Sequence, residues 1–215
     1  GATAAAVTVE SGSLAKLLSA CVFPAGLSMV ILAGSELFTG NCLMVMALLE
    51  RRITPAQLLR NWLTVYLGNA MGGAAVAALA VYSHTASLFG DGLARSMVSI
   101  AESKAALGAG DAFLRGVLCN FLVCLAVWMA AASKRAEGKV IALFFPILLF
   151  VLCGYEHCIA NLYYLPAGAF AAAEYGMETT LTLAGCLKNL AAVTLGNLVG
   201  GAALGVGYRF AYLKE

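Results

Sequence analysis

The chain has 215 residues, of which 62% are hydrophobic and 11% are charged, and its mean hydropathy is +0.90. A soluble domain carries about a quarter charged residues, and one soluble core of this length cannot bury so much apolar surface, so the composition excludes a water-soluble enzyme and a disordered chain. The net charge of +2 does not indicate a nucleic-acid partner, and at about 20 residues per spanning helix the length allows about six spans of a multi-pass membrane protein.

Apolar runs and charged connections predict the spans in chain order. Residues 1–10 are apolar but too short to cross a bilayer. After them we expect a span broken by GSELFTGN, a long span, a polar loop, another span, a second span broken by GYEHCIAN, and a last span. In that order the residues are 14–32 with 42–49, 55–82, 83–110, 111–132, 140–152 with 162–172, and 182–212.

The charged residues between these spans predict the orientation. Basic and acidic residues gather at alternate ends of successive spans. The basic ends hold Arg51, Arg52, Lys134, Arg135, Lys139, Arg209 and Lys214, and the acidic ends hold Asp91, Glu102, Glu174 and Glu178. Because basic connections stay in the cytoplasm, we expect an inner-membrane protein with both termini in the cytoplasm.

Two of the spans share one motif. LRNWLTVYLGNAMGGAA at 59–75 matches LKNLAAVTLGNLVGGAA at 187–203, and GSELFTGN shares its Gly, Glu and Asn with GYEHCIAN. The matched long spans are three crossings apart and therefore run in opposite directions. We expect a single channel domain over 1–215, built from inverted repeats of about 1–82 and 111–212. About half a helix is missing from the front of the first repeat, and no initial Met is present, so we expect an N-terminally trimmed chain.

Small residues in the repeated motif predict close helix packing. They lie at small-xxx-small spacing, with an asparagine in each copy placed to bond across the helix interface. These residues are Gly68, Gly72 and Gly73 with Asn69, and Gly196, Gly200 and Gly201 with Asn197. The seven cysteines lie in apolar runs without a CxxC pair, so we expect buried small residues and no disulfide, metal or other cofactor.

The two breaks are the candidate sites of function. Backbone that leaves a helix at membrane depth is tolerated only inside protein or beside a wet cavity, so the breaks predict the transport pathway. The first break contributes Leu37, Phe38 and Thr39, and the second contributes Glu156 and His157.

His157 is the residue of the breaks best suited to exchange a proton, because imidazole titrates near neutral pH. An apolar setting disfavours the charged ring, whereas an arriving anion favours it, so the pair can become a neutral acid and a neutral imidazole. The neutral acid crosses an apolar constriction more easily than its anion. A structural histidine that bonds the loop backbone is the alternative.

For other polar residues near the breaks, the sequence allows more than one role. Glu36 and Glu156 either hold the broken segments, by bonding backbone N–H groups or arginines, or act as transport carboxylates. Asn120 lies on an apolar span and is expected to face the interior. Lys104 lies beyond the membrane face, where a lone lysine is usually a solvated charge.

Four segments resemble the formate/nitrite transporter family, which includes the hydrosulfide channels. They are SELFTGN at 35–41, NWLTVYLGNAMGG at 61–73, CNFLVCLAVWMA at 119–130 and YEHCIANLYYLPAG at 155–168. The resemblance implies an all-α, six-helix aquaporin-like fold with two broken helices, assembled as a homopentamer with one pore in each protomer. It implies passage of small monovalent anions, either alone or together with a proton, and no enzyme activity.

The resemblance also assigns roles to residues. His157 resembles the central pore histidine and Thr39 its partner. Lys104 resembles a lysine that attracts anions in the outer vestibule, with Asn120 and Glu156 near the centre. The outer constriction would be formed by Phe23, Val123 and Phe150, and the inner one by Leu27, Leu37 and Phe38. The family's amphipathic N-terminal segment, linked to gating, falls in the missing front of the chain.

Together these features predict a channel for formate, nitrite or hydrosulfide that rejects strong-acid anions, because apolar rings on either side of one histidine oppose hydrated ions. An obligatory proton–anion symporter is the first alternative. A water or glycerol channel is a weaker one, since the Asn-Pro-Ala boxes are absent. An intramembrane enzyme is disfavoured because neither His84 nor His157 lies in an HExxH or GxSxG context.

Overall fold

The computed structural model describes residues 2–7 and 11–212, and all regular elements in these ranges are helical. The α-helices are α1 (Ala2–Val7), α2 (Gly12–Val22), α3 (Pro24–Ala33), α4 (Phe38–Asn41), α5 (Val45–Leu49), α6 (Pro55–Tyr82), α7 (Gly92–Ala106), α8 (Ala109–Ala131), α9 (Ala136–Leu152), α10 (Cys158–Glu174) and α11 (Leu183–Tyr212). Short 3₁₀ turns lie at Cys42–Met44 and Thr85–Ser87.

Four stretches of the described chain are long and apolar enough to cross a membrane. They are α2 with α3, α6, α8 and α11. The remaining helices of the two broken crossings are shorter: Phe38–Leu49 continues after α3, and α9 is followed by α10. The breaks therefore fall where the sequence predicts them, at 34–37 and 153–157.

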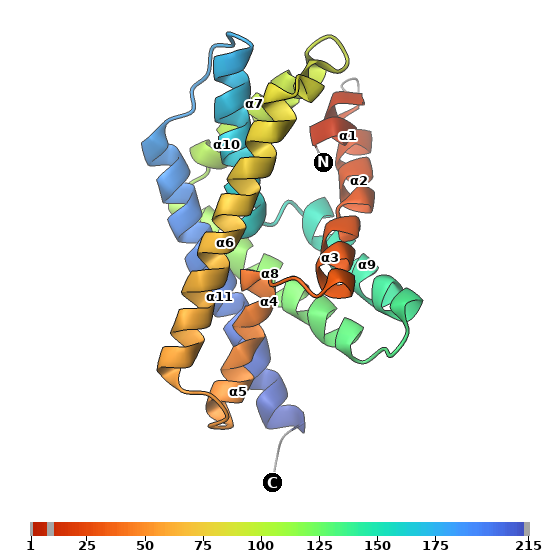
Figure 1. Cartoon of the computed structure of the whole chain (residues 1–215), viewed down its shortest axis with the longest axis vertical. Coiled ribbons are helices and arrows are strands. Elements are labelled where there is room, and N and C mark those ends of the chain that lie inside the picture. The colour runs from red at the N-terminus through yellow and green to blue at the C-terminus, as the bar shows by residue number, and fades with distance from the viewer. Residues whose placement is uncertain (1, 8–10, 213–215) are drawn as a thin grey trace.

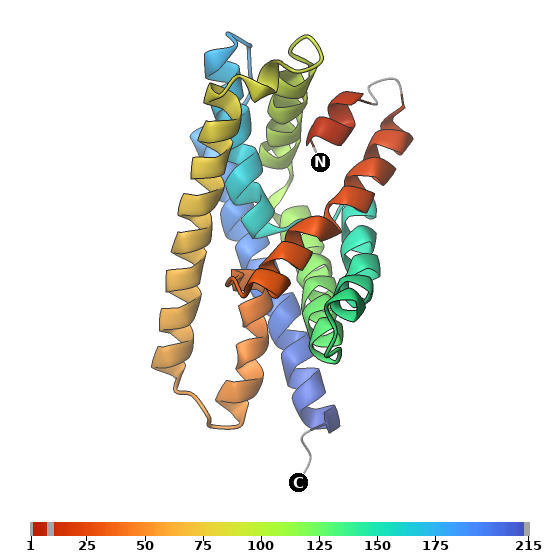
Figure 2. The ribbon, with the colours of Figure 1, turned by 45° about the vertical axis from the view of Figure 1, so that its right-hand side comes forward.

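The two broken crossings meet near the middle of the molecule. In Figures 1 and 2 the loop after α3 and the loop after α9 both run inward, so that α4 and α10 begin at the centre. Helices α2 and α3 pack along α9, and α10 packs between α6 and α7. The α5–α6 and α8–α9 connections and the C-terminal end of α11 point one way, and the α6–α7 and α10–α11 connections point the other (Figure 1). An ion pair of 2.8 Å between Glu50 and Arg209 ties two of the basic ends together.

The expectation of a loop over residues 83–110 is wrong. This segment contains the 15-residue helix α7. Its apolar residues Leu93, Met97 and Ala101 recur at helical spacing and are buried, against α10 and the neighbouring helices, while its polar residues occupy the other faces. Because polar and apolar residues are interspersed along this segment, its sequence did not indicate an amphipathic helix. This helix carries Lys104.

Glycines bring α11 and α8 into backbone contact. A Cβ atom at Gly196 or Gly200 would lie well inside 3.0 Å of a carbonyl oxygen of Phe113 or Val117, closer than real Cβ atoms come. This confirms the packing expected of the second copy of the motif.

The first copy of the glycine motif behaves differently. A Cβ at Gly73 would lie 3.0 Å from the carbonyl oxygen of Leu162 on α10, but Gly68 and Gly72 have no described atom within 4 Å of that position. The expected close packing is therefore found at Gly73 only.

The cysteines are free thiols. Four are buried, as expected, but Cys21 and Cys153 are exposed in the protomer and Cys186 is half-buried. The expectation of seven buried cysteines is wrong for these three because a helix in an apolar solvent can place an apolar side chain on its outer face as readily as in its core.

Candidate functional site

The first break is held by asparagines of α6. Asn69 accepts a hydrogen bond from the Phe38 N–H at 3.1 Å and donates one to the Glu36 carbonyl at 3.0 Å. Asn41 donates to the Glu36 carboxylate and to the Asn61 side-chain oxygen, the latter at 2.9 Å. Backbone groups that the broken helix leaves unpaired are thus satisfied by side chains, as an apolar setting requires.

The second break is held by asparagines of α11. Asn197 accepts from the Cys158 N–H at 2.8 Å and donates to the Glu156 carbonyl at 2.9 Å. Asn161 donates to the Glu156 carboxylate and to the Asn189 oxygen, both at 2.7 Å. These bonds repeat those of the first break with the same residue types at the same relative positions.

The asparagines of the repeated motif differ from expectation in one respect. Asn197 does bond across the α8 interface, because it also donates to the Gly116 carbonyl at 2.8 Å. Asn69 bonds only the first break. Both residues serve the broken loops, which the spacing of the small residues did not reveal.

The two halves differ at the residue that begins the inner helix. Leu37 is the N-cap of α4 and has no side-chain cap bond. His157 is the N-cap of α10, and its side chain accepts from the Ala160 N–H. The repeat therefore offers an apolar side chain at the first break and an imidazole at the second.

His157 joins the two breaks. Its Nδ1 accepts the Ala160 N–H at 3.0 Å, and its Nε2 lies 3.0 Å from Oγ1 of the fully buried Thr39. Because Nδ1 is an acceptor, the neutral ring carries its proton on Nε2 and donates it to Thr39. The Thr39 hydroxyl keeps its own proton available for another acceptor.

Thr39 is positioned by α8. Asn120 is buried, as expected, and donates to the Thr39 carbonyl at 3.2 Å and to the Asn197 carbonyl at 2.6 Å. Cys124 donates to the same Thr39 carbonyl at 3.2 Å. Asn120 thus connects both halves through their backbones and lines neither of the two cavities described below.

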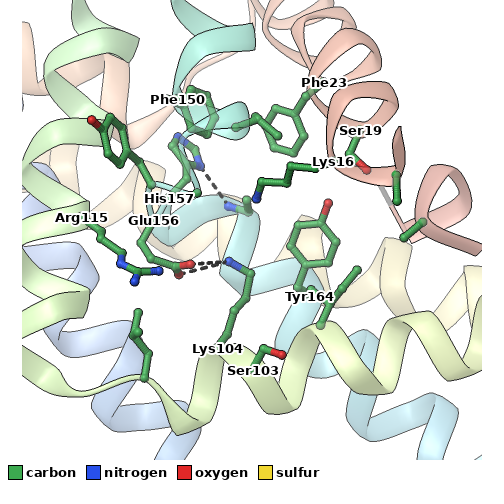
Figure 3. A pocket seen from close by; sticks show the side chains of 18 of the residues that line it. Lys16, Ser19, Phe23, Ser103, Lys104, Arg115, Phe150, Glu156, His157 and Tyr164 are labelled. Carbon is green, nitrogen blue, oxygen red and sulfur yellow. Dashed lines mark hydrogen bonds and ion pairs between the residues drawn. The ribbon is translucent and has the colours of Figure 1, made fainter. Parts of the chain in front are cut away.

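Two cavities meet at His157. We call them the outer and the inner cavity after the orientation expected from the sequence. Their volumes are about 390 Å³ and about 220 Å³, and both are lined by Phe23, Phe150, His157 and Ala160. The Phe23 and Phe150 rings meet edge to face with centroids 5.5 Å apart, and Phe150 stacks on the imidazole at 5.8 Å. Figure 3 shows the three rings side by side at the end of the outer cavity.

The inner cavity is apolar apart from His157. Its lining includes Leu27, Leu37 and Val123, together with further aliphatic residues and glycine. Phe38, expected in the inner constriction, is buried against Trp62 and Tyr66, with ring centroids 6.3 and 5.1 Å away, and lines neither cavity. Among the described residues that line this cavity, His157 is the one ionisable group.

Charged side chains line the outer cavity. The Lys104 ammonium lies 3.0 and 3.1 Å from the two carboxylate oxygens of Glu156, so Lys104 is not the solvated charge that its sequence context suggested. Neither carboxylate is held as expected: Glu156 binds Lys104 and Asn161 in place of an arginine, and Glu36 binds asparagines. The partner of Glu156 comes from α7, the helix that the sequence did not reveal.

Two cations of the outer cavity were not among the candidates from sequence. Lys16 on α2 and Arg115 on α8 also line it. Each is a charged residue inside an apolar span, and that isolation is a signal for a functional residue in a membrane protein.

Comparisons with known proteins find related sequences and related structures. Residues 1–211 match the family model described as "Formate/nitrite transporter". The "Probable formate transporter" of Methanothermobacter thermautotrophicus is 39% identical over 94% of this chain and 77% of its own length, and "Formate channel FocA" of Haemophilus influenzae is 38% identical over 92% and 74%. Among solved structures, an "FNT family ion channel" superposes with a TM-score of 0.84 at 34% identity, over 94% of this chain and 79% of that one. A "Pentameric formate channel with formate bound" gives 0.83 at 31% identity, over 99% and 91%.

Proposed function

The chain belongs to the formate/nitrite transporter family of multi-pass membrane proteins, and from that premise we propose that it conducts small monovalent anions of weak acids, with formate, nitrite and hydrosulfide as candidates. The observation that carries the proposal is a single imidazole where two cavities meet, with an apolar inner cavity beyond it. The names of the relatives, which refer to formate, support the same class of cargo.

The apolar inner cavity accounts for selectivity. A hydrated ion that enters it must lose its water. The free-energy cost of placing an unpaired charge in apolar surroundings is far larger than the stabilisation from the few contacts available there. Chloride has no means to become neutral. A weak-acid anion becomes neutral by taking one proton, and His157 is the ionisable residue placed to supply it.

His157 supplies the proton that neutralises the anion. A protonated imidazole and the anion A⁻ become a neutral imidazole and the acid HA, and the acid then either carries the proton inward or returns it as the anion leaves. In the protonated ring Nδ1 bears a proton and loses its bond from Ala160, which lies at 3.0 Å in the neutral ring. When one proton passes to the anion and the remaining proton lies on Nε2, Nδ1 again accepts from the Ala160 N–H, so the cap favours release of the proton.

Proteoliposomes that contain the intact protein test this function. Formate, nitrite and hydrosulfide uptake would be compared with chloride and nitrate uptake over a range of external pH, with empty liposomes as the blank. We expect protein-dependent flux of the weak-acid anions and little flux of the strong-acid anions. Equal flux of chloride, or rapid water flux without anion flux, would contradict the proposal.

Obligatory proton–anion symport is a second candidate. It is favoured by the inner cavity, in which no ionisable residue other than His157 is present among the described lining residues, so each anion must be neutralised there. Symport predicts one proton per anion at every pH, whereas a channel predicts a ratio that changes with pH. Simultaneous recording of internal pH and anion uptake distinguishes the two.

We also propose a homopentamer with a pore in each protomer, in an inner membrane, with the basic connections and both termini in the cytoplasm. A solved relative is described as a pentameric channel, and the basic residues gather at one end of the molecule. Native mass spectrometry and cysteine accessibility from each side of the membrane test these statements.

Replacing Phe23 by alanine is expected to weaken the rejection of chloride. Phe23 faces Phe150 at the junction of the two cavities, and loss of the ring lets water accompany an ion past His157. We expect chloride flux to rise by about tenfold, while formate flux changes less, because the desolvation barrier applies chiefly to the permanent ion.

Phe170→Ala is the control for this prediction, because Phe170 packs on Tyr82 and lines neither cavity. Chloride flux in Phe23→Ala that stays at the level of this control would show that the two rings do not form the barrier.

A further inference from the structure

We propose that Lys16, and not Lys104, is the cation that captures the anion in the outer cavity. This inference rests on the proposed function, since it assigns the entry step of the same pathway. The ligand is a small monovalent anion of carboxylate or nitrite size. The charged residues that line the outer cavity come from α2, α7, α8 and the second break.

The positive charge of Lys104 is largely neutralised by a neighbouring carboxylate, so it attracts an incoming anion weakly. Its ammonium contacts both oxygens of the Glu156 carboxylate, at 3.0 and 3.1 Å, and also lies 5.6 Å from the centre of the Tyr164 ring. The two side chains are largely buried, with 16% and 9% of their surfaces exposed. At a distance of several ångströms the opposite charges of such a pair largely cancel.

The carboxylate is itself fixed. Asn161 donates to Glu156 at 2.7 Å, and the Glu156 backbone N–H donates to the Arg115 carbonyl at 3.3 Å. An anion that displaced Glu156 from Lys104 would leave a buried carboxylate without its cation, and that exchange is strongly unfavourable.

Lys16 is placed differently. It extends from α2, across the cavity from the Lys104–Glu156 pair, and its ammonium points into the cavity toward His157 (Figure 3). It lies next to the second break, because a Cβ atom at Gly154 would be 3.7 Å from its Nζ. Within residues 2–7 and 11–212, the structure shows no hydrogen bond or ion pair to this ammonium.

Lys16 therefore forms no ion pair with a carboxylate of the described chain, although Glu156 and Lys104 both act on its charge through space. It lies at the mouth of the passage to His157. Such a charge raises the local concentration of anions and binds one weakly before it loses its water. A weak site of this kind suits conduction, which needs binding that favours entry and still permits exit.

The experiment measures initial formate uptake against formate concentration in proteoliposomes with the intact protein, at low and high ionic strength. The variants are Lys16→Met, Lys16→Arg, and the double variant Lys104→Met/Glu156→Gln. Lys134→Met is the control, because Lys134 is an exposed lysine outside both cavities.

We expect Lys16→Met to raise the half-saturating formate concentration by about three- to tenfold at low ionic strength, as the loss of one charge several ångströms from the anion implies. The increase should shrink in high salt, which screens exposed charges, and Lys16→Arg should restore the wild-type value. The maximal rate of Lys16→Met should stay within about twofold of wild type, since the passage beyond His157 is unchanged.

The double variant shows whether Lys16 or Lys104 captures the anion. It removes the Lys104 charge together with its partner, and the glutamine that replaces Glu156 keeps a side-chain oxygen that can accept from Asn161, so we expect its half-saturating concentration to rise clearly less than that of Lys16→Met. If the double variant loses formate affinity while Lys16→Met resembles Lys134→Met, Lys104 is the capturing cation and the inference is overturned. If the wild-type protein conducts no weak-acid anion, the proposed function itself fails, and this outcome is distinct from a failure at Lys16.

Discussion

Replacement of Gly200 by alanine is expected to prevent the normal packing of α11 on α8. The added Cβ would lie well inside 3.0 Å of the Val117 carbonyl oxygen, and neither backbone can yield without separating the two helices. Overpacking of this kind costs about 1–3 kcal/mol even against movable side chains. We expect a large fall in the melting temperature of the purified protein, or loss of the folded protein from the membrane.

Gly207→Ala is the matched control on the same helix. No described atom lies within 4 Å of a Cβ at Gly207, and alanine in an open helical position is favoured over glycine by about 0.5–1 kcal/mol. The two substitutions are therefore expected to act in opposite directions. Equal melting temperatures for Gly200→Ala and wild type would show that α11 and α8 are not in backbone contact.

Replacement of Asn197 by alanine is expected to remove the hydrogen bonds that hold the loop of the second break in place. The side chain makes three hydrogen bonds in a fully buried position, to the Cys158 N–H and to the carbonyls of Glu156 and Gly116. Each buried group left without a partner costs about 1–3 kcal/mol. We expect a marked fall in stability and loss of selective anion flux, because the same loop positions His157.

Asn69→Ala provides the comparison in the first half. Asn69 makes two of the corresponding bonds, to Phe38 and Glu36, in a half-buried position, so we expect a smaller loss of stability, of about 1 kcal/mol. Thermal unfolding of the two variants in one detergent measures the difference. A larger effect at Asn69 than at Asn197 would contradict this account of the second break.

Much of this fold could be predicted because the sequence contains an internal repeat, so that each repeated structural feature is indicated in both halves. The Leu-Gly-Asn and Gly-Gly-Ala-Ala residues recur in both long helices, and the interruptions GSELFTGN and GYEHCIAN recur before their inner helices. Composition alone indicates a membrane protein, and a break at membrane depth points to the pathway. The approach of Thr39 to His157, at 3.0 Å, was expected from the family resemblance.

Other features could not be predicted, since they depend on which face of a helix meets which neighbour. The buried face of α7 lies among small and polar residues, so its sequence resembles a loop, and its Lys104 resembles a solvated charge. The partner of Glu156 was missed for the same reason. Phe38 follows Leu37 directly, but Leu37 is the extended N-cap and Phe38 begins α4. One side chain therefore lines the inner cavity and the other packs on Trp62 and Tyr66.

We expect His157 to exchange a proton with the passing anion. His157→Asn tests it with little disturbance of the fold, because asparagine is a favoured N-cap residue whose side-chain oxygen can accept the Ala160 N–H in place of Nδ1. The substitution removes the one titratable group that lines the described inner cavity and keeps a hydrogen-bonding side chain at the junction.

The measurement is formate uptake into proteoliposomes as a function of external pH, for wild type and His157→Asn, with the uptake of empty liposomes subtracted. We expect wild-type uptake to rise as the pH falls, because protons become available to the imidazole. We expect the variant to lose this dependence and most of its flux. Flux in His157→Asn with the wild-type pH profile would contradict proton exchange at His157 and leave the histidine as a structural cap of α10.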